Sequence, residues 1–498
     1  MASRADRQDS PLWPLFIGLS LILLAIVPPD TPGGDGESML AVADSLATGP
    51  TFSVDCAVGV PGGDGQCYSN FYPLMSLLAA PIVWLGRTVG SAAGVSPEYA
   101  GHLLAFVIPA LAAAGAAALA GDLARRLGAS RAGVVGVAVA VALCTEMLTY
   151  SRSFFAETLA AFCVTLAVWG LTGPPGRRWT GYAGIALAVL AKPQTALFGP
   201  AVGLALALHQ RRIRPFLECC AATAASSLFF FAYNWHRFGS PTDFGGETRE
   251  LSASDFAPID VIEGIGLHTI SPGRGFIWFS PVAALGLFLL WRRRRQLIPA
   301  VCLAGCLGLV VLYLGNPGTG FNWGSRYVVA MLPLMCLGLV GVTGNLRRVA
   351  IALAVLGLVI QIPNVVGFYD RYHREQADIG IDSTDNHWSV SGSQLVNVWP
   401  AALRQLDAAG DRDVETVVNG APERGGTTED QVLLNIVALW WWGLPAVGVP
   451  WAVGLLLCLA MIAAGLIVLA REAGWSGRSE RGSPRRRYFS RKALIRSA

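Results

Sequence analysis

The chain has 498 residues, of which 53% are hydrophobic and 14% are charged, and its mean hydropathy is +0.50. An average soluble domain has about 25% charged residues, so this composition excludes an ordinary soluble protein and indicates a membrane protein. The formal net charge is only +4, which makes the distribution of the basic residues more informative than their sum.

Apolar segments of membrane-spanning length recur along the whole chain. Because a segment in lipid must satisfy its backbone hydrogen bonds internally, we expect an all-α polytopic membrane protein. The predicted transmembrane helices, about twelve in number, cover 12–27, 101–120, 132–149, 155–171, 179–191, 194–209, 215–234, 276–291, 297–315, 327–343, 349–366 and 446–470.

Arg-rich connections alternate with connections that are poor in basic residues. The Arg-rich set comprises "GDLARRLGASR", "GPPGRRW", "HQRRIRP", "RRRRQ" and "NLRR", together with the two chain ends. The positive-inside rule therefore places the N-terminal residues 1–11 and the tail 471–498 in the cytoplasm, and the protein in the cytoplasmic membrane. We expect the first span to be a retained anchor. The basic, Ser-rich tail is expected to be disordered; it either attracts anionic lipid or serves only as a topology signal.

The first outer loop, 28–100, is acidic at its start. Residues 28–70 contain six acidic residues and no Lys or Arg. Asp35 and Glu37 precede "SMLAVADSLATG", which predicts a short amphipathic helix at the lipid boundary. Residues 71–99 are apolar, but a span there would turn "GDLARRLGASR" outward, so we expect interfacial helices. Cys56 and Cys67 predict a disulfide on an oxidising face, and two free thiols are the alternative.

Asp35 and Glu37 are the candidate general bases of this loop. A carboxylate without a basic partner can accept a proton if its surroundings tune its pKa. Asp35 is favoured because its Gly neighbours allow a bulky substrate to approach the backbone. The alternative is a solvated acidic loop without a catalytic role.

Further ionisable residues fall at the outer ends of the predicted spans. The basic ones outline an anion site that faces the acidic loop, because Lys and Arg suit phosphate oxygens; they are Lys192, Arg274 and Arg326, with His236 and His268 nearby. In a second cluster, Arg152 lies between Glu146 and Glu157, and ionisable groups at membrane depth are candidates for a function. Two alternatives remain open: long side chains that extend toward the interface, and a local Arg–Glu pair of Arg152 with Glu146 or Glu157.

Two outer segments follow the predicted span that ends at residue 366. Residues 367–430 are polar and are expected to form a small cap of short helices. Residues 431–445 contain three consecutive Trp residues and are expected to form an interfacial helix before the last span. Walker, dinucleotide-binding and HExxH motifs are missing from the sequence, so ATP-driven transport and zinc proteolysis are unsupported.

Several stretches occur in an order that resembles a known family. They are "GGDGESMLAVADSLATG", "NFYPLMSLLAAPIVWLG", "YSRSFFAETLAAFCVTLAVW", "LAVLAKPQTALFGP", "YNWHRFGSPTDFG", "SPGRGFIWFSPV" and "FNWGSRYVVAMLPL", and they cover most of residues 10–345. Together they resemble the GT-C superfamily of integral membrane glycosyltransferases, especially the branch of protein O-mannosyltransferases, aminoarabinose transferases and their actinobacterial relatives.

The resemblance implies a GT-C-like catalytic module over 12–366. Such an enzyme moves a sugar from a polyprenyl-phosphate donor to a lipid, glycan or protein acceptor at the outer face of the cytoplasmic membrane, usually with inversion. The matching base is Asp35, with Glu37 two positions on because Gly36 intervenes. By the resemblance, the donor phosphate would meet Lys192, Arg274 and Arg326. From their positions at the outer ends of the spans, we also expect Arg152 at the donor phosphate, and Glu157 and His268 at the substrate.

The resemblance does not determine the cofactor, and it leaves two alternative functions open. Some members use a divalent metal, but the sequence alone shows no ligand cluster and predicts no metal ligand. No nucleic-acid partner is expected, whereas membrane lipids are. The alternative functions are a transporter or flippase of lipid-linked sugars and a non-catalytic scaffold.

Overall fold

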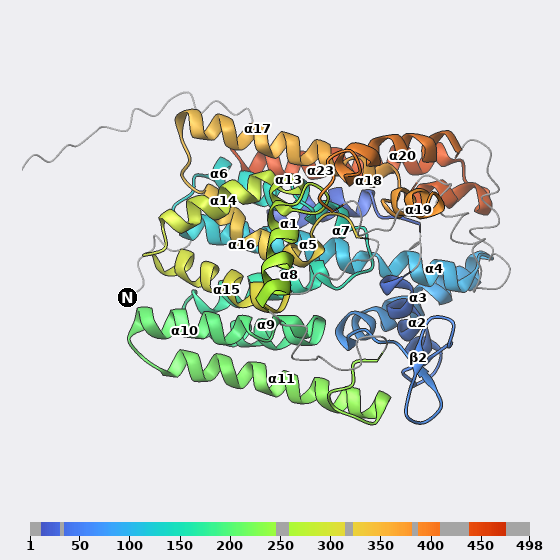
Figure 1. The fold of residues 1–498 in the computed structure, drawn as a ribbon. Coiled ribbons are helices and arrows are strands. Elements are labelled where there is room, and N and C mark those ends of the chain that lie inside the picture. Colours follow the sequence, from blue (N-terminus) through green and yellow to red (C-terminus); the bar gives the residue numbers. More distant parts are fainter. Residues whose placement is uncertain are drawn as a thin grey trace, which may run out of the picture.

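A computed structural model describes residues 11–29, 34–245, 258–313, 322–380, 387–408 and 438–474. Most of the described chain is helical (Figure 1). The α-helices are α1 (Leu12–Ala25), α2 (Asp35–Thr48), α3 (Pro73–Ala93), α4 (Pro97–Ala105), α5 (Val107–Arg126), α6 (Arg131–Leu143), α7 (Met147–Tyr150), α8 (Glu157–Leu171), α9 (Arg178–Ala191), α10 (Phe198–Gln210), α11 (Arg214–Phe238), α12 (Pro258–Ile270), α13 (Phe276–Phe279), α14 (Pro281–Arg292), α15 (Leu297–Tyr313), α16 (Leu332–Cys336), α17 (Gly344–Gln361), α18 (Pro363–Val366), α19 (Asp370–Asp378), α20 (Gln394–Ala408) and α23 (Trp451–Glu472).

Short 3₁₀ segments join several of these helices. They are η2 (Pro175–Arg177), η3 (Pro193–Thr195), η5 (Arg326–Met331), η6 (Leu337–Leu339) and η8 (Trp440–Val447). The predicted span 327–343 is therefore an interrupted helix made of η5, α16 and η6. A side chain at Gly338 would overlap the backbone of Gly286 in α14, so glycine permits the close approach of this segment to α14.

Within the described residues, five helical segments are long and apolar enough to cross a membrane. They are Pro73–Ala93, Pro97–Arg126, Arg214–Phe238, Gly344–Val366 and Trp451–Glu472, and shorter apolar helices lie beside them. Large apolar side chains such as Leu228, Phe229 and Leu456 are exposed on these helices, as expected for a surface that faces lipid. The described chain thus has the features of a polytopic membrane protein. Segment Pro73–Ala93 has the length of a span, and its interfacial position stays a prediction.

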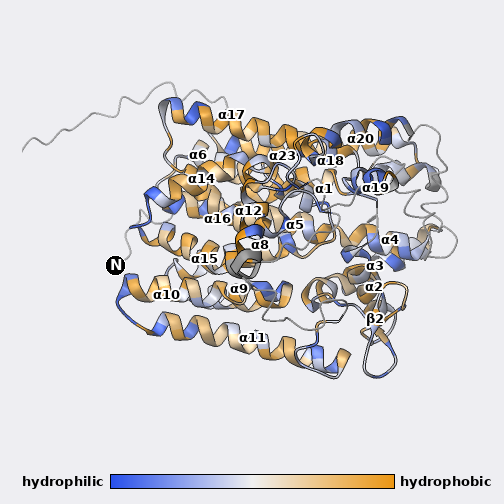
Figure 2. Ribbon diagram, viewed as in Figure 1, coloured by the Kyte–Doolittle hydropathy of each residue, from blue (hydrophilic) through white to orange (hydrophobic). Residues whose placement is uncertain are grey.

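The helices run side by side and leave polar segments at both ends of the bundle. The connections between α10 and α11 and between α14 and α15 lie at one end, whereas α2, the β-strands, α19 and α20 lie at the other (Figure 1). Hydrophilic residues gather toward the two ends and apolar residues between them (Figure 2). This division places the first outer loop and the cap at the end opposite to two of the Arg-rich connections.

Helix α5 forms the centre of the bundle. Its Ala-rich surface is buried over most of its length, and it packs against α1, α6 and α8. The last long helix, α23, returns to α1, where a Cβ atom at Gly465 would lie 2.5 Å from the Gly18 carbonyl oxygen. Small residues of this kind allow two membrane helices to pack backbone to backbone.

The all-α prediction omitted a small antiparallel sheet in the first outer loop. Strands β1 (Ser53–Val54), β2 (Val60–Pro61) and β3 (Cys67–Tyr68) pair in the order β1-β3-β2. A disulfide joins Cys56 to Cys67, as expected, with their Cα atoms 5.1 Å apart. Strands of two residues are too short to produce a recognisable alternating pattern, which is why the sequence did not reveal them.

The described part of the predicted cap, within 367–430, contains helices α19 and α20, which pack against each other. Gln405 of α20 accepts a hydrogen bond from the Phe368 backbone N–H at 2.9 Å and so joins the cap to the end of α18. The expected interfacial helix at 431–445 lies partly outside the described residues, and its described part is the 3₁₀ segment η8. The tail from residue 475 onward also lies outside the described residues.

Candidate active site

Four of the predicted site residues form one connected chain of ion pairs. Arg326 Nη2 lies 2.7 Å from Asp35 Oδ2, and Arg326 Nε lies 3.2 Å from Glu157 Oε1. Glu157 in turn accepts a hydrogen bond from Lys192 Nζ. The residues come from α2, α8, the junction of α9 with η3, and η5. The fold thus brings together residues that are up to 291 positions apart in sequence, since 326 − 35 = 291.

Exposure distinguishes the two ends of this ion-pair chain. The side chain of Asp35 is 28% exposed, whereas those of Glu157 and Lys192 are only 4% and 3% exposed. Arg326, at 15%, lies between these extremes. Asp35 is therefore the carboxylate that a substrate can reach, and Glu157 is an internal partner of two cations.

Aromatic rings surround the cations of the ion-pair chain. The Arg326 guanidinium lies 5.2 Å from the centroid of the Phe155 ring and 5.6 Å from that of the Tyr327 ring. Lys192 Nζ lies 5.1 Å from the same Tyr327 centroid. These contacts orient both cations without neutralising their charge. Tyr327 was not among the predicted site residues, although it directly follows Arg326.

Asp35 is positioned by the start of α2. Gly34 has a φ of 75°, a conformation that glycine adopts without strain, and the helix begins at the next residue. Asp35 and Glu37 both lie in the first turn of α2, where the helix dipole favours negative charge. Residues two positions apart do not face each other on a helix. Asp35 faces Arg326, so Glu37 points in a different direction.

Lys192 is positioned by the proline that follows it. The backbone of Lys192 is extended, with φ −159° and ψ 103°, and Pro193 begins the next 3₁₀ segment. A residue before proline is disfavoured in the helical conformation, so α9 ends at Ala191. The sequence "AKP" thus ends a membrane helix at a lysine whose side chain is buried against Glu157.

Arg326 is positioned by a loop that Glu146 organises. The buried Glu146 carboxylate accepts hydrogen bonds from the Ser325 backbone N–H at 2.6 Å and from the Ser280 hydroxyl at 2.9 Å. Gly324 has a φ of 51°, and a side chain there would overlap Glu146 Oε1. Arg326 Nη1 donates to Asn322 Oδ1 at 2.9 Å within the same loop. The loop therefore has little freedom to move the guanidinium.

His268 and Arg274 adjoin this cluster. The His268 Nδ1 atom lies 3.1 Å from the Ser325 hydroxyl, and its ring contacts Tyr327 edge to face at 5.1 Å. Arg274 is 1% exposed. Burial lowers the pKa of Arg274, and the charge of Arg326 adds to this lowering, so the two guanidinium groups interact. Two cations that repel each other in a buried setting are suited to share an anionic ligand.

The cap helix α19 borders the same cluster through His373. Its Nε2 atom lies 3.0 Å from the Asn322 carbonyl oxygen, and the side chain is 3% exposed. Burial, followed by the charge of Arg274, lowers the pKa of His373 to about 3. His373 is therefore neutral at ordinary pH and donates a hydrogen bond to the loop that carries Arg326.

An apolar groove lies between several of the helices. Its volume is about 350 Å³, and its wall is formed by residues of α12 to α16, including Thr269, Leu287, Leu307, Val328 and Met335. Thr269 follows His268, and Val328 lies two positions after Arg326. Two residues that line the groove are thus close in sequence to members of the charged cluster.

Arg152 does not join the cluster, and the expectation that it contacts the donor phosphate is therefore wrong. All three of its guanidinium nitrogens donate to backbone carbonyls, those of Ile26 at 2.5 Å, Asn364 and Ala438. Neither the expected phosphate contact nor a pair with a neighbouring Glu is its role in this structure. Instead, Arg152 holds three chain segments together, because burial leaves its donors only backbone oxygens as partners.

Comparisons with known proteins identify distant similarity of fold. No protein-family description and no curated protein match the chain. Two crystal structures of ArnT from Cupriavidus metallidurans superpose on it, both at 13% identity. The apo structure gives a TM-score of 0.47 and covers 92% of this chain and 76% of ArnT; the structure bound to undecaprenyl phosphate gives 0.49 and covers 94% and 78%.

A third similar structure is the archaeal oligosaccharyltransferase AglB from Archaeoglobus fulgidus, in complex with an inhibitory peptide and a dolichol-phosphate. Its identity is 14% and its TM-score 0.38, and the match covers 71% of this chain and 55% of AglB. With TM-scores below 0.5 and identities of 13–14%, these similarities assign no activity to the chain.

Proposed function

We propose that the chain is an integral membrane glycosyltransferase of the GT-C type that transfers a sugar from a polyprenyl-phosphate donor to an acceptor hydroxyl. The observation that carries this proposal is the pairing of the accessible carboxylate of Asp35 with Arg326, at the edge of a buried group of cations. An accessible carboxylate next to several cations provides the groups that such a transfer needs.

The donor phosphate would bind to Arg326, Lys192 and Arg274. In the described part of the chain, Arg326 pairs with both Asp35 and Glu157, and Lys192 pairs with Glu157. The charge of Arg326 also acts on Arg274, so the three cations lie close to one another. When Arg326 binds the donor phosphate, the Asp35 carboxylate loses its ion-pair partner and becomes available as a base.

The reaction would be a single displacement at the anomeric carbon. The acceptor oxygen forms a bond to this carbon while the bond from the carbon to the phosphate oxygen breaks. The bonding electrons leave with the polyprenyl phosphate, and the acceptor proton moves to Asp35. The cations stabilise the negative charge that develops on the leaving phosphate in the transition state more strongly than they stabilise the bound donor. This difference accelerates the reaction. Attack opposite to the leaving group inverts the configuration.

The apolar groove suits the lipid part of this donor. A polyprenyl chain needs an apolar wall near the site that binds its phosphate, and the groove is lined by Thr269 and Val328, one and two positions after His268 and Arg326 in the sequence. Helix α2 lies at the end of the bundle opposite to the α10–α11 connection, which contains Arg211 and Arg212 (Figure 1). If this basic connection is cytoplasmic, the reaction takes place at the outer face of the membrane.

Replacement of Asp35 tests the proposal. In membranes supplied with radiolabelled polyprenyl-phosphate sugars, Asp35→Asn should reduce sugar transfer by about 100-fold or more, since general bases contribute about 10²–10⁴. Asp55→Asn, which changes an exposed acid of the same loop, should leave transfer unchanged. Full activity of Asp35→Asn, or loss of activity only in Glu37→Gln, would overturn the role of Asp35. Movement of the label across the membrane without a new glycosidic bond would indicate a transporter instead.

A further inference from the structure

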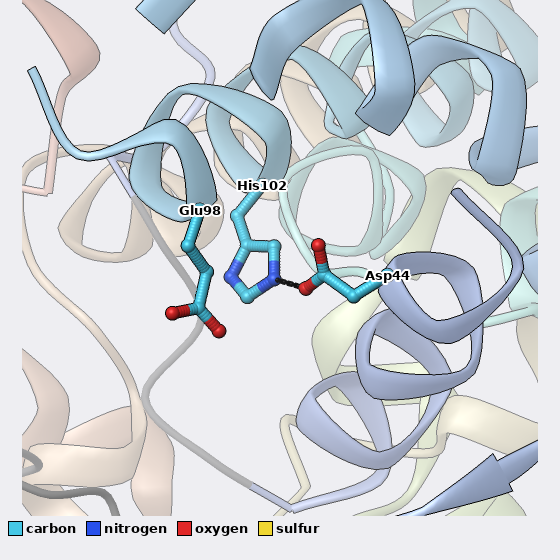
Figure 3. Close-up of side chains that lie close together, drawn as sticks. All are labelled: Asp44, Glu98 and His102. Atoms are coloured by element: carbon cyan, nitrogen blue, oxygen red, sulfur yellow. Dashed lines mark hydrogen bonds and ion pairs between the residues drawn. The ribbon is translucent and has the colours of Figure 1, made fainter. Parts of the chain in front are cut away.

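A second group of ionisable side chains lies in the first outer loop, away from the ion-pair chain. Asp44 of α2 and Glu98 and His102 of α4 each offer one ligating atom, and these atoms lie within 4.8 Å of one another. The close-up shows the His102 ring between the two carboxylates (Figure 3). Asp44 lies nine residues after Asp35, which is about 14 Å along the helix axis. The group is thus separate from the proposed active site.

Helix geometry and burial give this group a fixed arrangement. Glu98 and His102 are four positions apart, so both lie on the same face of α4. The His102 side chain is 2% exposed and its Nε2 atom lies 2.5 Å from Asp44 Oδ2. Arg87 of α3 pairs with the other oxygen, Asp44 Oδ1, at 2.8 Å. Arg87 thereby fixes the carboxylate and leaves Oδ2 directed at the ring.

The helices that carry these residues are packed too closely to move apart easily. At the crossing of α3 and α4, a Cβ atom at Gly86 would lie 2.5 Å from the Ala100 carbonyl oxygen, and one at Gly90 would lie 2.7 Å from the Ala100 Cβ. Helices α3 and α4 therefore form a rigid pair. Helix α2 meets this pair at Asp44, through both Arg87 and His102.

We propose that Asp44, Glu98 and His102 bind one divalent transition-metal ion of the zinc type, which fastens α2 to the α3–α4 pair. Two carboxylate oxygens and one imidazole nitrogen are ligands that zinc accepts, with water as the fourth ligand. Metal bonds of about 2.0–2.2 Å require the three side chains to rotate toward one point. Arg87 acts as the outer partner that orients the Asp44 carboxylate. Because α2 begins at Asp35, the metal would also restrict the movement of Asp35, the proposed base.

Metal binding to the full-length chain tests this proposal without any sugar donor. The purified protein in nanodiscs is stripped with EDTA and titrated with Zn²⁺ by calorimetry; Co²⁺ serves as a spectroscopic probe. We expect one saturable site, a higher melting temperature with Zn²⁺, and a visible Co²⁺ absorption band. Glu98→Gln and His102→Asn each remove a metal ligand. Each should weaken Zn²⁺ binding by more than about 10–100-fold, which is the loss expected when a residue that only orients a ligand is changed.

A matched control removes a histidine outside the group. His236 is exposed and lies on α11, so His236→Ala should retain the binding of the wild type. Glu98 is only partly buried, so Glu98→Gln should fold even if His102→Asn does not. The proposal is overturned if the wild type shows no saturable Zn²⁺ binding, or if Glu98→Gln binds as tightly as the wild type. It is also overturned if His102→Asn lowers the melting temperature equally with and without Zn²⁺, which would identify a plain ion-pair network. Loss of sugar transfer in Asp35→Asn does not bear on any of these outcomes.

Discussion

Arg326 Nη2 lies 2.7 Å from Asp35 Oδ2, and this ion pair joins the first turn of the first outer loop helix to the loop before α16. The same guanidinium faces Glu157, which also holds Lys192. The pair thus connects the accessible acid of the site with its buried cations. Its position leads to predictions that mutagenesis can test.

Replacement of Arg326 by Lys tests the importance of the planar guanidinium. Lysine keeps the charge but cannot contact Asp35 and a phosphate through a rigid fork. We expect kcat/KM for the lipid donor to fall by about 10–100-fold, which corresponds to about 1.4–2.8 kcal/mol of transition-state stabilisation. Arg404→Lys is the matched control, because Arg404 pairs with Glu375 in the outer cap. Equal activity of Arg326→Lys and the wild type would contradict a phosphate role of Arg326.

Removal of Lys192 should affect both stability and transfer. Lys192→Met leaves the Glu157 carboxylate buried at 4% exposure with Arg326 as its remaining charged partner among the described residues. Breaking a buried pair costs about 3–5 kcal/mol, and we expect about 3 kcal/mol because Arg326 still faces Glu157.

The double variant Lys192→Met with Glu157→Gln separates these two effects. Neutralising Glu157 removes the unpaired charge, so most of the stability should return, whereas transfer should stay low because a cation of the phosphate site is missing. The free energy of unfolding from denaturant titration and the transfer assay give the two values. Recovery of transfer together with stability would make Lys192 a purely structural residue.

Gly324→Ala tests the loop that carries Arg326. The φ of 51° disfavours alanine, and the added methyl group would overlap the Glu146 carboxylate. Gly94→Ala is the matched control, because Gly94 has a φ of 73° with open space around its Cβ position. The control should lose about 1–2 kcal/mol through strain alone. Gly324→Ala should lose more and should also reduce donor binding; equal losses in the two variants would show that the Glu146 contact is unimportant.

The buried His373 should lower the free energy of unfolding in acid. Its pKa is lowered to about 3 by burial, whereas the unfolded chain has a histidine pKa near 6.5, so between these values the unfolded state binds more protons. The stability contributed by neutral His373 is present above about pH 6.5 and is lost as the pH falls toward 3. The slope is at most about 1.4 kcal/mol per pH unit.

The variant His373→Gln isolates this contribution. Glutamine can still donate to the Asn322 carbonyl but does not titrate. Unfolding free energies measured from pH 7 to pH 5 should fall less steeply in the variant than in the wild type. Parallel curves for the two proteins would show that His373 protonates normally in the folded state.

The Cys56–Cys67 disulfide should stabilise the small sheet locally. It closes a loop with a sequence separation of 11, for which the chain-entropy estimate is about 2–3 kcal/mol. In Cys56→Ser, amide hydrogen exchange over 53–68 should become faster, while the bundle helices keep their protection. Alkylation of both thiols in the native, unreduced protein would contradict the disulfide.

Much of the ion-pair chain could be predicted because its residues are unusual for their places. Lys192 is a lysine between two apolar segments, and Asp35 follows two glycines after the first span. Ionisable groups next to membrane spans are costly, so they stand out in a hydrophobic sequence. Their pairing through Glu157 could not be predicted, because it depends on how α2, α8 and η5 pack together.

Other features gave weaker signals in the sequence. Arg152, like Arg326, is a basic residue at the outer end of a predicted span, so the sequence does not distinguish them. Only the structure shows that the Arg152 guanidinium donates to backbone carbonyls. Glu98 and His102 have the spacing of residues on one helix face, but Asp44 is 54 positions before Glu98, since 98 − 44 = 54. The group became visible only when the packing of α2 on α4 was known.

The most direct test of the account is a structure of the chain with a polyprenyl-phosphate analogue. We predict that the phosphate oxygens lie within hydrogen-bond distance of Arg326 and at least one of Lys192 and Arg274, with the first isoprene units in the groove next to Val328. Asp35 should then be free of Arg326 and face the position of the sugar. A phosphate bound elsewhere, with the Asp35–Arg326 pair intact, would contradict the account.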